Sequence, residues 1–216
     1  MAIMIIPVSN RDALRFYQLH HYTKGLANNV MSFGAYELIN GAYELQACCS
    51  FGQPISENLR ASIFGAQHVD HVKELQRLAR SPHCGFSMSW FMSRSIRLYQ
   101  RARRLKQLSE PWCVISFADD VQGHHGGVYQ SMSWLYLGSS TNMRDIYTDQ
   151  DGRFRHSRQN GINIDKQTAI ERGWAHSRVQ TTKHRYIKIL GTPKQRKHRL
   201  NALKLQVMPY PKPDHD

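Results

Sequence analysis

Short apolar runs separated by turn residues dominate the start of the chain and are typical of β-strands. Three such runs precede the first long polar stretch: 3–8, 32–38 and 43–51. The last two flank Asn40-Gly41, a dipeptide favoured in two-residue hairpin turns, so an antiparallel hairpin is predicted there. Between the first and second runs, Ser9 or Asn10 is expected to cap a helix over 11–21.

The pattern then changes toward helical periodicity. Residues 53–70 are polar and irregular, which indicates an insertion or a mobile loop, and residues 71–78 fit either a strand or a short helix. A longer helix is expected over 87–108, after the Ser81-Pro82 break. Its apolar stripe consists of Phe91, Leu98, Ala102 and Leu105. The run 112–118 indicates a strand buried on both faces, so the helix before it is predicted to form a βαβ crossover.

The second half of the chain gives weaker signals. A run over 134–137 indicates a strand that stops at Gly138, and a run over 186–190 indicates a last strand. Between them the composition is polar, with Asp151-Gly152 as a predicted hairpin turn. The succession of elements predicts a mixed α/β sheet of the α+β kind, in which a central twisted sheet is flanked by helices.

Two acids, Asp119 and Asp120, follow directly after the buried run at 112–118. A polar turn with two histidines comes next, and then a helical segment around Tyr129. Buried carboxylates are costly unless they are paired, and open α/β sheets place ligands at the carboxyl ends of their strands. This stretch is therefore interpreted as a ligand site. The alternative is that both acids cap the following turn and stay solvated.

The net charge is the most unusual bulk property of the chain. Lys and Arg total 29 against 16 acidic residues, which gives a formal net charge of +13. Such an excess favours a polyanionic partner, nucleic acid first and an anionic membrane second. The length of 216 residues and the 41% hydrophobic content indicate one folded domain, expected over 1–190, and a basic, proline-ending tail over 191–216.

Cysteine usage and apolar run lengths argue against several classes of protein. The four cysteines contain no CxxC pair, so neither a zinc ribbon nor a disulfide framework is indicated. No apolar run reaches the length of a membrane span, and the first run lacks the basic lead-in of a signal peptide. We therefore expect a soluble cytoplasmic protein without a membrane partner, while the oligomeric state stays open.

Two groups of cations are candidates for contacts with a DNA backbone. The first has helical spacing and consists of Arg94, Arg97, Arg101 and Arg104. The second lies in the tail and consists of Lys194, Arg196, Lys197 and Arg199. A solvated helix face would carry the same pattern as the first group. Neutralising several phosphates would make DNA binding steeply dependent on salt.

Four blocks occur in a characteristic order and spacing along the chain: HHYTKG, ELQRLAR, SMSWFMSRSIR and VISFADDVQGHHGGVYQSMSWLYLG. In this order they resemble the phage Mom-type DNA adenine modification proteins, which are regarded as distant relatives of the GNAT acyltransferases. The resemblance covers most of residues 15–140, and its last block is the specific part. Nothing beyond residue 150 contributes to it.

The resemblance implies a GNAT-like fold and an enzyme that modifies double-stranded phage DNA in the host cytoplasm. It implies a carbamoylmethyl-type group on the exocyclic 6-amino group of adenine, acetyl-CoA as donor, and escape from host restriction as the purpose. One alternative is a GNAT-type acetyltransferase acting on RNA or protein. Another is a non-catalytic nucleic-acid-binding protein, which the charge alone would explain but which has no use for acids at a strand end.

Carried onto this chain, the resemblance indicates four catalytic residues: Asp119, Tyr129, Arg77 and His21. Asp119 would accept the proton of the amine, Tyr129 would donate to the thioester sulfur, and Arg77 would pair with a carboxylate, a phosphate or an oxyanion. Packing alone also explains a tyrosine on a helix and an arginine on a surface. His21 beside His20 equally suits a structural histidine.

The acetyl-CoA site is expected at the start of the long helix. GNAT enzymes hold the CoA pyrophosphate with a Q/R-x-x-G-x-G/A loop, whereas residues 80–89 here hold one glycine and one proline, so that fingerprint is absent. The candidate donor-binding residues are Leu78, Arg80, Gly85, Ser87, Ser89 and Tyr129. An iron or zinc site formed by His124 and His125 with Asp119 and Asp120 stays open as a further alternative.

Overall fold

The apolar runs near the start of the chain form an antiparallel meander. The computed structural model describes residues 2–26, 30–54, 56–120, 123–155, 158–159 and 162–211. Strands β1 (Ile3–Val8), β2 (Met31–Ile39) and β3 (Ala42–Gly52) pair in chain order. Asn40 and Gly41 both have positive φ, 50° and 84°, as this type of two-residue turn requires. The predicted hairpin is confirmed.

An eight-stranded sheet forms the centre of the molecule, in the order β1-β2-β3-β4-β5-β10-β6-β7. Its remaining strands are β4 (Val72–Arg80), β5 (Cys113–Asp119), β6 (Leu135–Thr148), β7 (Phe154–Arg155) and β10 (Ala175–Ile189). A separate two-stranded ladder consists of β8 (Arg158–Gln159) and β9 (Ile162–Asn163). β4 and β5 pair in parallel, and the other described pairs are antiparallel, so the sheet is mixed as predicted.

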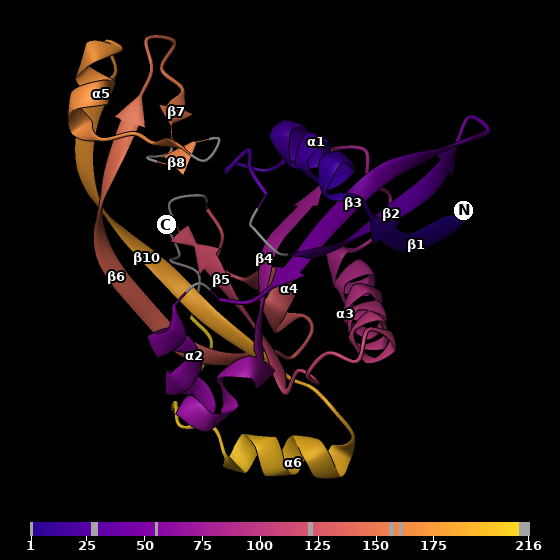
Figure 1. Ribbon diagram of the computed structural model, residues 1–216. Helices are drawn as coiled ribbons and strands as arrows, with labels where there is room; N and C mark the ends of the chain where they lie inside the picture. The colour runs from indigo at the N-terminus through magenta and orange to yellow at the C-terminus, as the bar shows by residue number, and fades with distance from the viewer. Residues whose placement is uncertain are drawn as a thin grey trace.

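Helices cover both faces of the sheet (Figure 1). The helices of the described residues are α1 (Asn10–His20), α2 (Glu57–Phe64), the 3₁₀ helix η1 (Ala66–His71), α3 (Met88–Leu105), α4 (Gly127–Gln130), α5 (Lys166–Glu171) and α6 (Pro193–Asn201). α1 and α2 pack on one face, called the α1 face, and α3 and α4 pack on the other, the α3 face. No helix within the described residues combines the length and the apolar character needed to cross a membrane.

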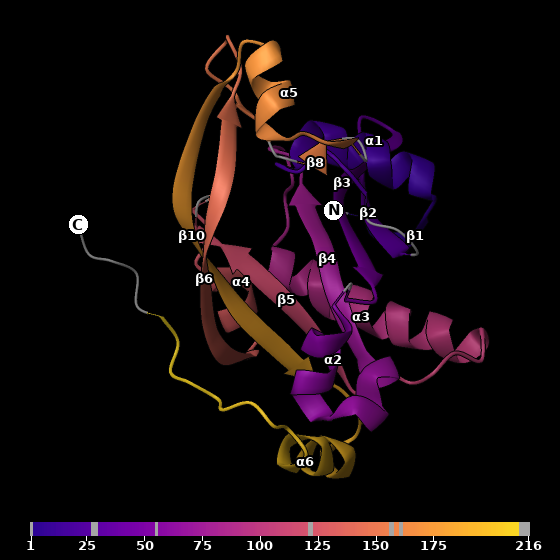
Figure 2. The same cartoon turned by 60° about the vertical axis from the view of Figure 1, so that its left-hand side comes forward.

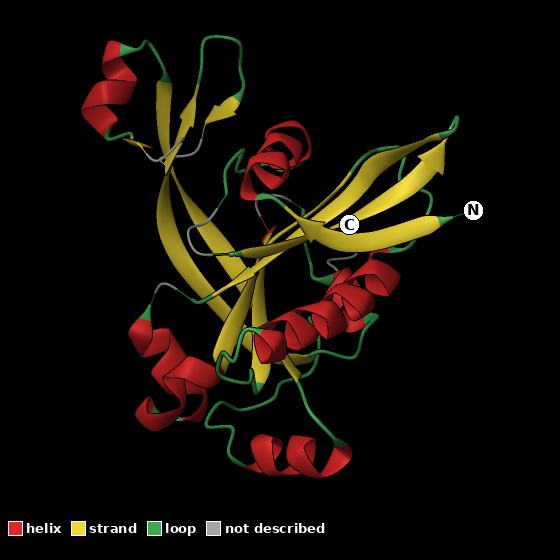
Figure 3. Ribbon diagram, turned by 45° about the vertical axis from the view of Figure 1, so that its right-hand side comes forward, coloured by secondary structure: helices red, strands yellow, loops and turns green. Residues whose placement is uncertain are grey.

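The βαβ crossover predicted in the middle of the chain is confirmed. β4 leads into α3, which lies along one face of the sheet and returns the chain to the parallel strand β5 (Figure 3). The helix buries Phe91, Met92, Ile96 and Tyr99 against the sheet. The predicted stripe is therefore right for Phe91 but wrong for Leu105, which is 75% exposed because it occupies the last turn, where the following residues are exposed as well.

The prediction of an irregular loop over 53–70 is wrong. This segment contains α2 and η1, and α2 inserts Ile63 and Phe64, exposed by only 0% and 2%, into the core beside β5. The Ser56 side chain accepts a hydrogen bond from the Leu59 amide, which caps the helix at its start, and Gly65 ends it at φ 104°. Because only the end of this short helix is buried, its sequence reads as polar.

The strand ends predicted at Gly138 and at residue 186 are also wrong. β6 continues through Gly138, whose φ is 82°, to Thr148, and β10 begins at Ala175. The two strands pair with each other along this extension, which rises beside the rest of the sheet with α5 at its far end (Figure 1). Both of its faces are largely exposed, so no apolar alternation marks it. The predicted Asp151-Gly152 turn is confirmed between β6 and β7.

The described part of the tail, residues 191–211, packs against the domain. Thr192 and Gln195 form a capping box at the start of α6. Arg199 is 4% exposed, donates to the Leu190 carbonyl oxygen at 2.8 Å and forms an ion pair with Glu110 at 3.2 Å. Farther along, the Tyr210 hydroxyl donates to the Trp134 carbonyl oxygen at 2.8 Å. The cations of α6 therefore sit on a helix that is fixed to the core.

The contribution of the buried end of α2 to stability can be tested by substitution. Replacing Phe64 by alanine removes a fully buried ring and should lower the free energy of unfolding by about 3–5 kcal/mol. Leu19→Ala, at a position that is 72% exposed, should change it by less than about 0.5 kcal/mol. Urea denaturation followed by circular dichroism measures both, and equal small effects would restore the loop interpretation of residues 53–70.

Candidate active site

The parallel strands β4 and β5 part after three residue pairs. The pairs are Val72 with Cys113, Lys73 with Val114 and Glu74 with Ile115. Beyond them the two strands diverge (Figure 2). The stretches 75–80 and 116–119 then line a cavity of about 710 Å³. Backbone groups that face a gap in a sheet need partners, and a concave site with converging polar groups is where a ligand is expected.

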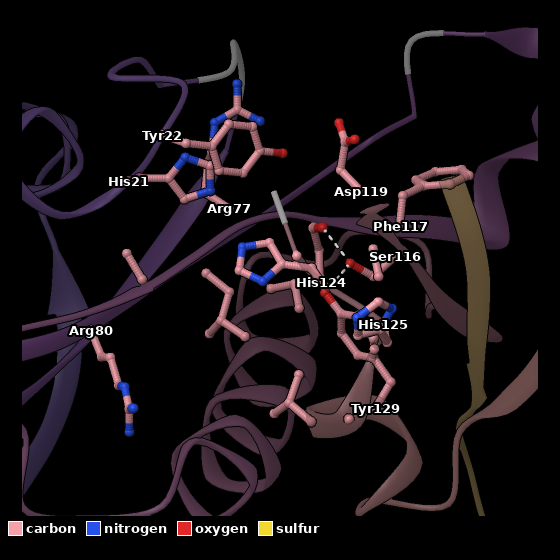
Figure 4. A pocket seen from close by; sticks show the side chains of 18 of the residues that line it. His21, Tyr22, Arg77, Arg80, Ser116, Phe117, Asp119, His124, His125 and Tyr129 are labelled. Carbon is pink, nitrogen blue, oxygen red and sulfur yellow. Dashed lines mark hydrogen bonds between the residues drawn. The ribbon is translucent and has the colours of Figure 1, made fainter. Parts of the chain in front are cut away.

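The cavity is lined from both faces of the sheet. Side chains directly opposite each other in an antiparallel pair share a face, and Ile115 and Ile187 pack with α2, so the odd-numbered residues of β5 point to the α1 face. Phe117 and Asp119 therefore lie on that face, where His21 and Tyr22 also line the cavity. Ser116, Tyr129 and the loop before α4 line it from the α3 face. Figure 4 shows these two groups in the upper and lower parts of the view.

Asp119 and Asp120 have different roles in the structure. Asp119 ends β5, is 5% exposed, and lies directly opposite Lys183 of β10 in the register. Opposite charges in such a pair attract each other across the strands. The Asp120 carboxylate accepts a hydrogen bond from the Thr182 amide of β10 at 2.9 Å, and so links the end of β5 to that strand. The solvated-cap alternative fails for Asp119, which is buried in the wall of the cavity.

Tyr129 is held by a chain of two hydrogen bonds. The Ser116 hydroxyl donates to the Leu75 carbonyl oxygen at 3.0 Å, and the Ser116 and Tyr129 hydroxyl oxygens are 2.8 Å apart. Since serine has one hydroxyl proton, the Tyr129 hydroxyl is the donor in the second bond. Burial raises the pKa of Tyr129 to about 12, so this side chain is a protonated phenol at neutral pH.

The loop before α4 is fixed by Tyr186 of β10. The Tyr186 hydroxyl donates to the His125 carbonyl oxygen at 2.8 Å and accepts from the side-chain Nε2 of Gln130 at 3.1 Å. Gly126 has a φ of 81° and lies so close to the Tyr186 ring that any Cβ there would collide with it. The side chains of His124 and His125 are exposed. Among the described residues, no three His, Cys, Asp or Glu side chains gather in a group that could hold a metal ion.

His21 and Arg77 anchor the α1 side of the cavity. The Nδ1 atom of His21 accepts the Thr23 amide at 3.1 Å, and its ring stacks on Tyr22 with centroids 4.4 Å apart. Burial is the main reason that the pKa of His21 falls to about 3, and Arg77 is the next contributor. The Arg77 Nε donates to the Gly25 carbonyl oxygen at 2.9 Å. Arg77 therefore ties the loop after α1 to β4 at the edge of the cavity.

The expected donor-binding residues divide into two groups. Leu78, Arg80 and Tyr129 line the cavity. Gly85, Ser87 and Ser89 do not line it, but lie at the start of α3, where the Ser87 hydroxyl accepts the Trp90 amide at 3.3 Å as the helix cap. Their role in donor binding stays a prediction.

The expected DNA-binding residues also divide. The four arginines of the α3 stripe are exposed, with the Arg94 guanidinium 4.1 Å from the centroid of the Trp90 ring. Lys194, Arg196 and Lys197 are exposed on α6. Arg199 is buried in the ion pair described above, so we remove it from the candidate DNA surface. The sequence pattern could not separate it from its neighbours because a basic run gives no sign of which side chain points inward.

Several residues of the site were missed in the sequence. Ser116 and Phe117 lay inside an apolar run and looked like core, although strand alternation sends them to opposite faces of an open cavity. Tyr22 was part of the HHYTKG block but was not singled out. Lys183 comes to Asp119 only through the register of β10, which no local pattern reveals. Glu74 lies at the last parallel pair, and burial raises its pKa to about 7.

Known proteins resemble this chain in both sequence and fold. The model of the Mom protein family matches residues 2–212. The methylcarbamoylase mom of Escherichia phage Mu is 33% identical over 127 residues, which are 56% of this chain and 49% of that protein, so the match spans about half of its length.

Among solved structures, a candidate acetyltransferase of Acinetobacter baylyi has a TM-score of 0.50 and 10% identity, covering 89% of this chain and 94% of that one. An acetyltransferase of the GNAT family from Streptococcus pneumoniae has a TM-score of 0.49 and 10% identity, covering 88% and 100%. The likeness to the first structure concerns the fold alone, and the GNAT-like architecture expected from the sequence is confirmed.

Burial of His21 should make the folded protein less stable in acid. The ordinary pKa of histidine is 6.5, whereas the folded ring takes up a proton only near 3, so between these values the unfolded chain binds a proton that the folded chain does not. The stability that the neutral His21 ring contributes is fully present above pH 6.5. As the pH falls from 6.5 toward 3, the free energy of unfolding decreases by up to about 1.4 kcal/mol per pH unit. Urea unfolding at a series of pH values measures this slope.

His21→Asn keeps an acceptor at the position of Nδ1 but cannot take up the proton. The free energy of unfolding of this variant should therefore depend less steeply on pH than that of the unaltered protein. His20→Asn changes the neighbouring, part-exposed histidine and is the matched control. Identical slopes for all three proteins would contradict this account of His21.

The bond between Ser116 and Tyr129 should appear as coupling between two substitutions. Ser116→Ala leaves a buried phenol without its acceptor and should cost about 1–3 kcal/mol of unfolding free energy, while Tyr129→Phe should cost about 1 kcal/mol. The double variant should lose less than the sum, because the second change removes the group that the first left unpaired. Strictly additive losses in urea denaturation would show that the two hydroxyls do not interact.

Proposed function

This chain belongs to the Mom protein family, and on that premise we propose that it is an acyltransferase-like enzyme that modifies adenine in phage DNA. The group transferred is of the carbamoylmethyl type, derives from acetyl-CoA, and is placed on the 6-amino group of the base. The relative from phage Mu is named a methylcarbamoylase. The reaction would take place in the cytoplasm of the infected host and protect the phage DNA from restriction. The observation that carries the proposal is a cavity through the sheet with Asp119 and Tyr129 on its two sides.

The opened sheet fits an acyl donor that carries amide groups. Past Glu74 and Ile115, β4 and β5 no longer pair with each other. Apart from the Leu75 carbonyl oxygen, which accepts the Ser116 hydroxyl, the backbone groups that face the opening are proposed to pair with an extended, amide-containing chain. The start of α3, an 18-residue helix, favours an anion through its amides and its dipole. Arg80, Gly85, Ser87 and Ser89 are the residues proposed to hold the pyrophosphate, and Leu78 and Tyr129 the residues proposed to flank the acyl arm.

The residues on both sides of the cavity fit the chemistry at the amine and at the sulfur. The 6-amino group of adenine is a weak nucleophile, so a proton must leave as the new bond to carbon forms. Asp119 is proposed to accept that proton, a contribution of about a hundred- to ten-thousand-fold in rate. Tyr129 stays protonated at neutral pH and is proposed to donate to the departing sulfur. Arg77 and His21 are proposed to position the acceptor from the α1 face.

An acetyl and a carbamoylmethyl product would be formed differently. In the second, the methyl carbon of the acetyl unit joins the base, which removes a hydrogen and two electrons from that carbon, and the carbonyl carbon exchanges CoA for an amino group. This product therefore also consumes a nitrogen donor of the ammonia class and a two-electron oxidant as co-substrates. Both products require that the amine loses a proton and that CoA departs, and these are the two steps to which residues of this chain are assigned. The mass of the modified nucleoside therefore distinguishes the acetyl product from the carbamoylmethyl product.

The DNA duplex is the proposed macromolecular partner. An adenine inside a duplex must be flipped out to reach a buried acid, and the net charge of +13 favours phosphate contacts. The exposed cations of α3 and of α6 are proposed to contact the DNA backbone. The alternative of a non-catalytic DNA binder gives no reason for a carboxylate that is 5% exposed in the wall of a cavity.

The proposed function is tested by mass spectrometry of nucleosides from plasmid DNA that was co-expressed with the protein. A heavier deoxyadenosine should appear with the unaltered protein and fall at least about a hundredfold with Asp119→Asn. Asp119→Asn should bind DNA as tightly as the unaltered protein at each salt concentration, because Asp119 faces the base rather than the phosphates. Asp70→Asn, at an exposed position outside the cavity, is the matched control.

Two outcomes would contradict these assignments. If DNA binding by Asp119→Asn fell as much as modification, the catalytic role of Asp119 would be wrong. If the folded, unaltered protein left DNA unmodified, the adenine reaction itself would be wrong. Calorimetric titration with acetyl-CoA would then separate an acetyltransferase for RNA or protein, which binds it, from a nucleic-acid-binding protein, which does not.

A further inference from the structure

Phe117 departs from the burial pattern of the strand that carries it. Ser116 and Ala118 on either side are 2% and 3% exposed, whereas the Phe117 ring is only partly buried and lines the cavity. It packs at the margin of the core cluster under α2 and points to the α1 face together with Asp119. Figure 4 shows both side chains on the same side of β5. A large aromatic ring is thus presented to the cavity beside the buried acid.

Arg185 lies directly opposite Phe117 in the pairing of β10 with β5. Its guanidinium carbon is 5.9 Å from the centroid of the Phe117 ring. The Nε atom is buried and has no hydrogen-bond partner among the residues that the structure describes. A buried guanidinium donor without an acceptor is costly, and burial also lowers the pKa of this side chain. Arg185 as a whole is only partly buried, so its guanidinium is open to an acceptor from outside the chain.

We propose that Phe117 and Arg185 form a subsite for a flipped adenine nucleotide of the DNA strand. The Phe117 ring stacks on the base, and the Arg185 guanidinium takes an adjacent phosphate. Aromatic faces commonly bind unpaired bases by stacking, and a guanidinium matches the geometry of a phosphate. This inference rests on the proposed function, because it states how that reaction's acceptor is held.

The spacing along β5 suits this arrangement. Residues two apart on a strand are about 7 Å apart, which is about the width of a stacked purine. A base lying on Phe117 therefore presents an edge to Asp119, the residue proposed to take the proton. Tyr22, which is 39% exposed, lies on the other side of Asp119 in Figure 4. Tyr129 approaches from the α3 face, so the base and the acyl donor would meet in the opening between β4 and β5.

The subsite is tested by binding of labelled single-stranded oligonucleotides, measured by fluorescence anisotropy without any acyl donor. One oligonucleotide is all adenine, and the other has the same backbone with abasic positions. Phe117→Leu should weaken binding of the adenine oligonucleotide about tenfold and leave binding of the abasic one unchanged. Phe117→Tyr keeps an aromatic face and should bind as the unaltered protein does.

Arg185→Met keeps an apolar stem over the Phe117 ring but removes the charge. It should weaken binding of both oligonucleotides alike and make the dependence of binding on salt shallower by about one phosphate contact. The matched controls are Tyr43→Leu, at an aromatic position that is 51% exposed on the β2–β3 hairpin, and Arg178→Gln, at an exposed position of β10 outside the cavity. Neither should change the preference for adenine over abasic DNA or the dependence of binding on salt.

The subsite is overturned if Phe117→Leu binds adenine as tightly as the unaltered protein, or if it loses both oligonucleotides equally. A Phe117→Leu protein that fails to fold is replaced by Phe117→Tyr and Phe117→Ile, whose difference in adenine binding then decides the same question. The failure of the proposed function looks different. Binding that depends on Phe117 with no modified adenine in plasmid DNA would overturn the reaction and keep the subsite.

Discussion

The site depends on one constraint, which is that β4 and β5 stay paired for only three residues. Each strand is held firmly on its outer side, β4 by β3 and β5 by β10, so the two can part without losing their places in the sheet. A register shift between β3 and β4 lies at Leu75 and Arg77, where the parting begins. Such a bulge bends the strand that carries it and increases its twist. The gap in the sheet is thus built into β4 and needs no flexible segment.

The parting of the strands also organises the polar groups around it. The Leu75 carbonyl oxygen is left without a backbone partner on β5 and accepts a hydrogen bond from the Ser116 side chain of that strand instead, and the Ser116 hydroxyl in turn accepts from the Tyr129 hydroxyl. The orientation of the Tyr129 phenol therefore depends, through Ser116, on a carbonyl oxygen that would have paired with a β5 amide if the two strands had stayed together. On the other face, Asp119 stands opposite a lysine at the point where β5 ends. The separation of β4 from β5 thus creates an opening that has an oriented phenol, Tyr129, on one face and a buried carboxylate, Asp119, on the other.

The sequence predicted this region better than the rest of the chain, for physical reasons. Buried strands and a helix with one buried face leave apolar periodicity, so the meander, the crossover and the strand before Asp119 were recoverable. The four residues expected to be catalytic all line one cavity. The long pairing of β6 with β10 was not predicted, because strands exposed on both faces need no apolar alternation. Arg199 looked like a surface cation, since only the tertiary contacts of α6 show that it is buried against Glu110.

A cavity open to both faces of a sheet suits a reaction between two bulky substrates. A duplex cannot enter a narrow cleft, and an acyl donor with a long polar arm would block a site that had a single entrance. Here the α1 face presents a partly buried aromatic ring and a carboxylate, and the α3 face presents a protonated phenol and the start of a long helix. Under the proposed function each face would hold one substrate, and only the reacting atoms would need to meet in the plane of the sheet. The α1 face rather than the α3 arginine stripe would then carry the contacts that select the base, and the cations elsewhere would add affinity without specificity.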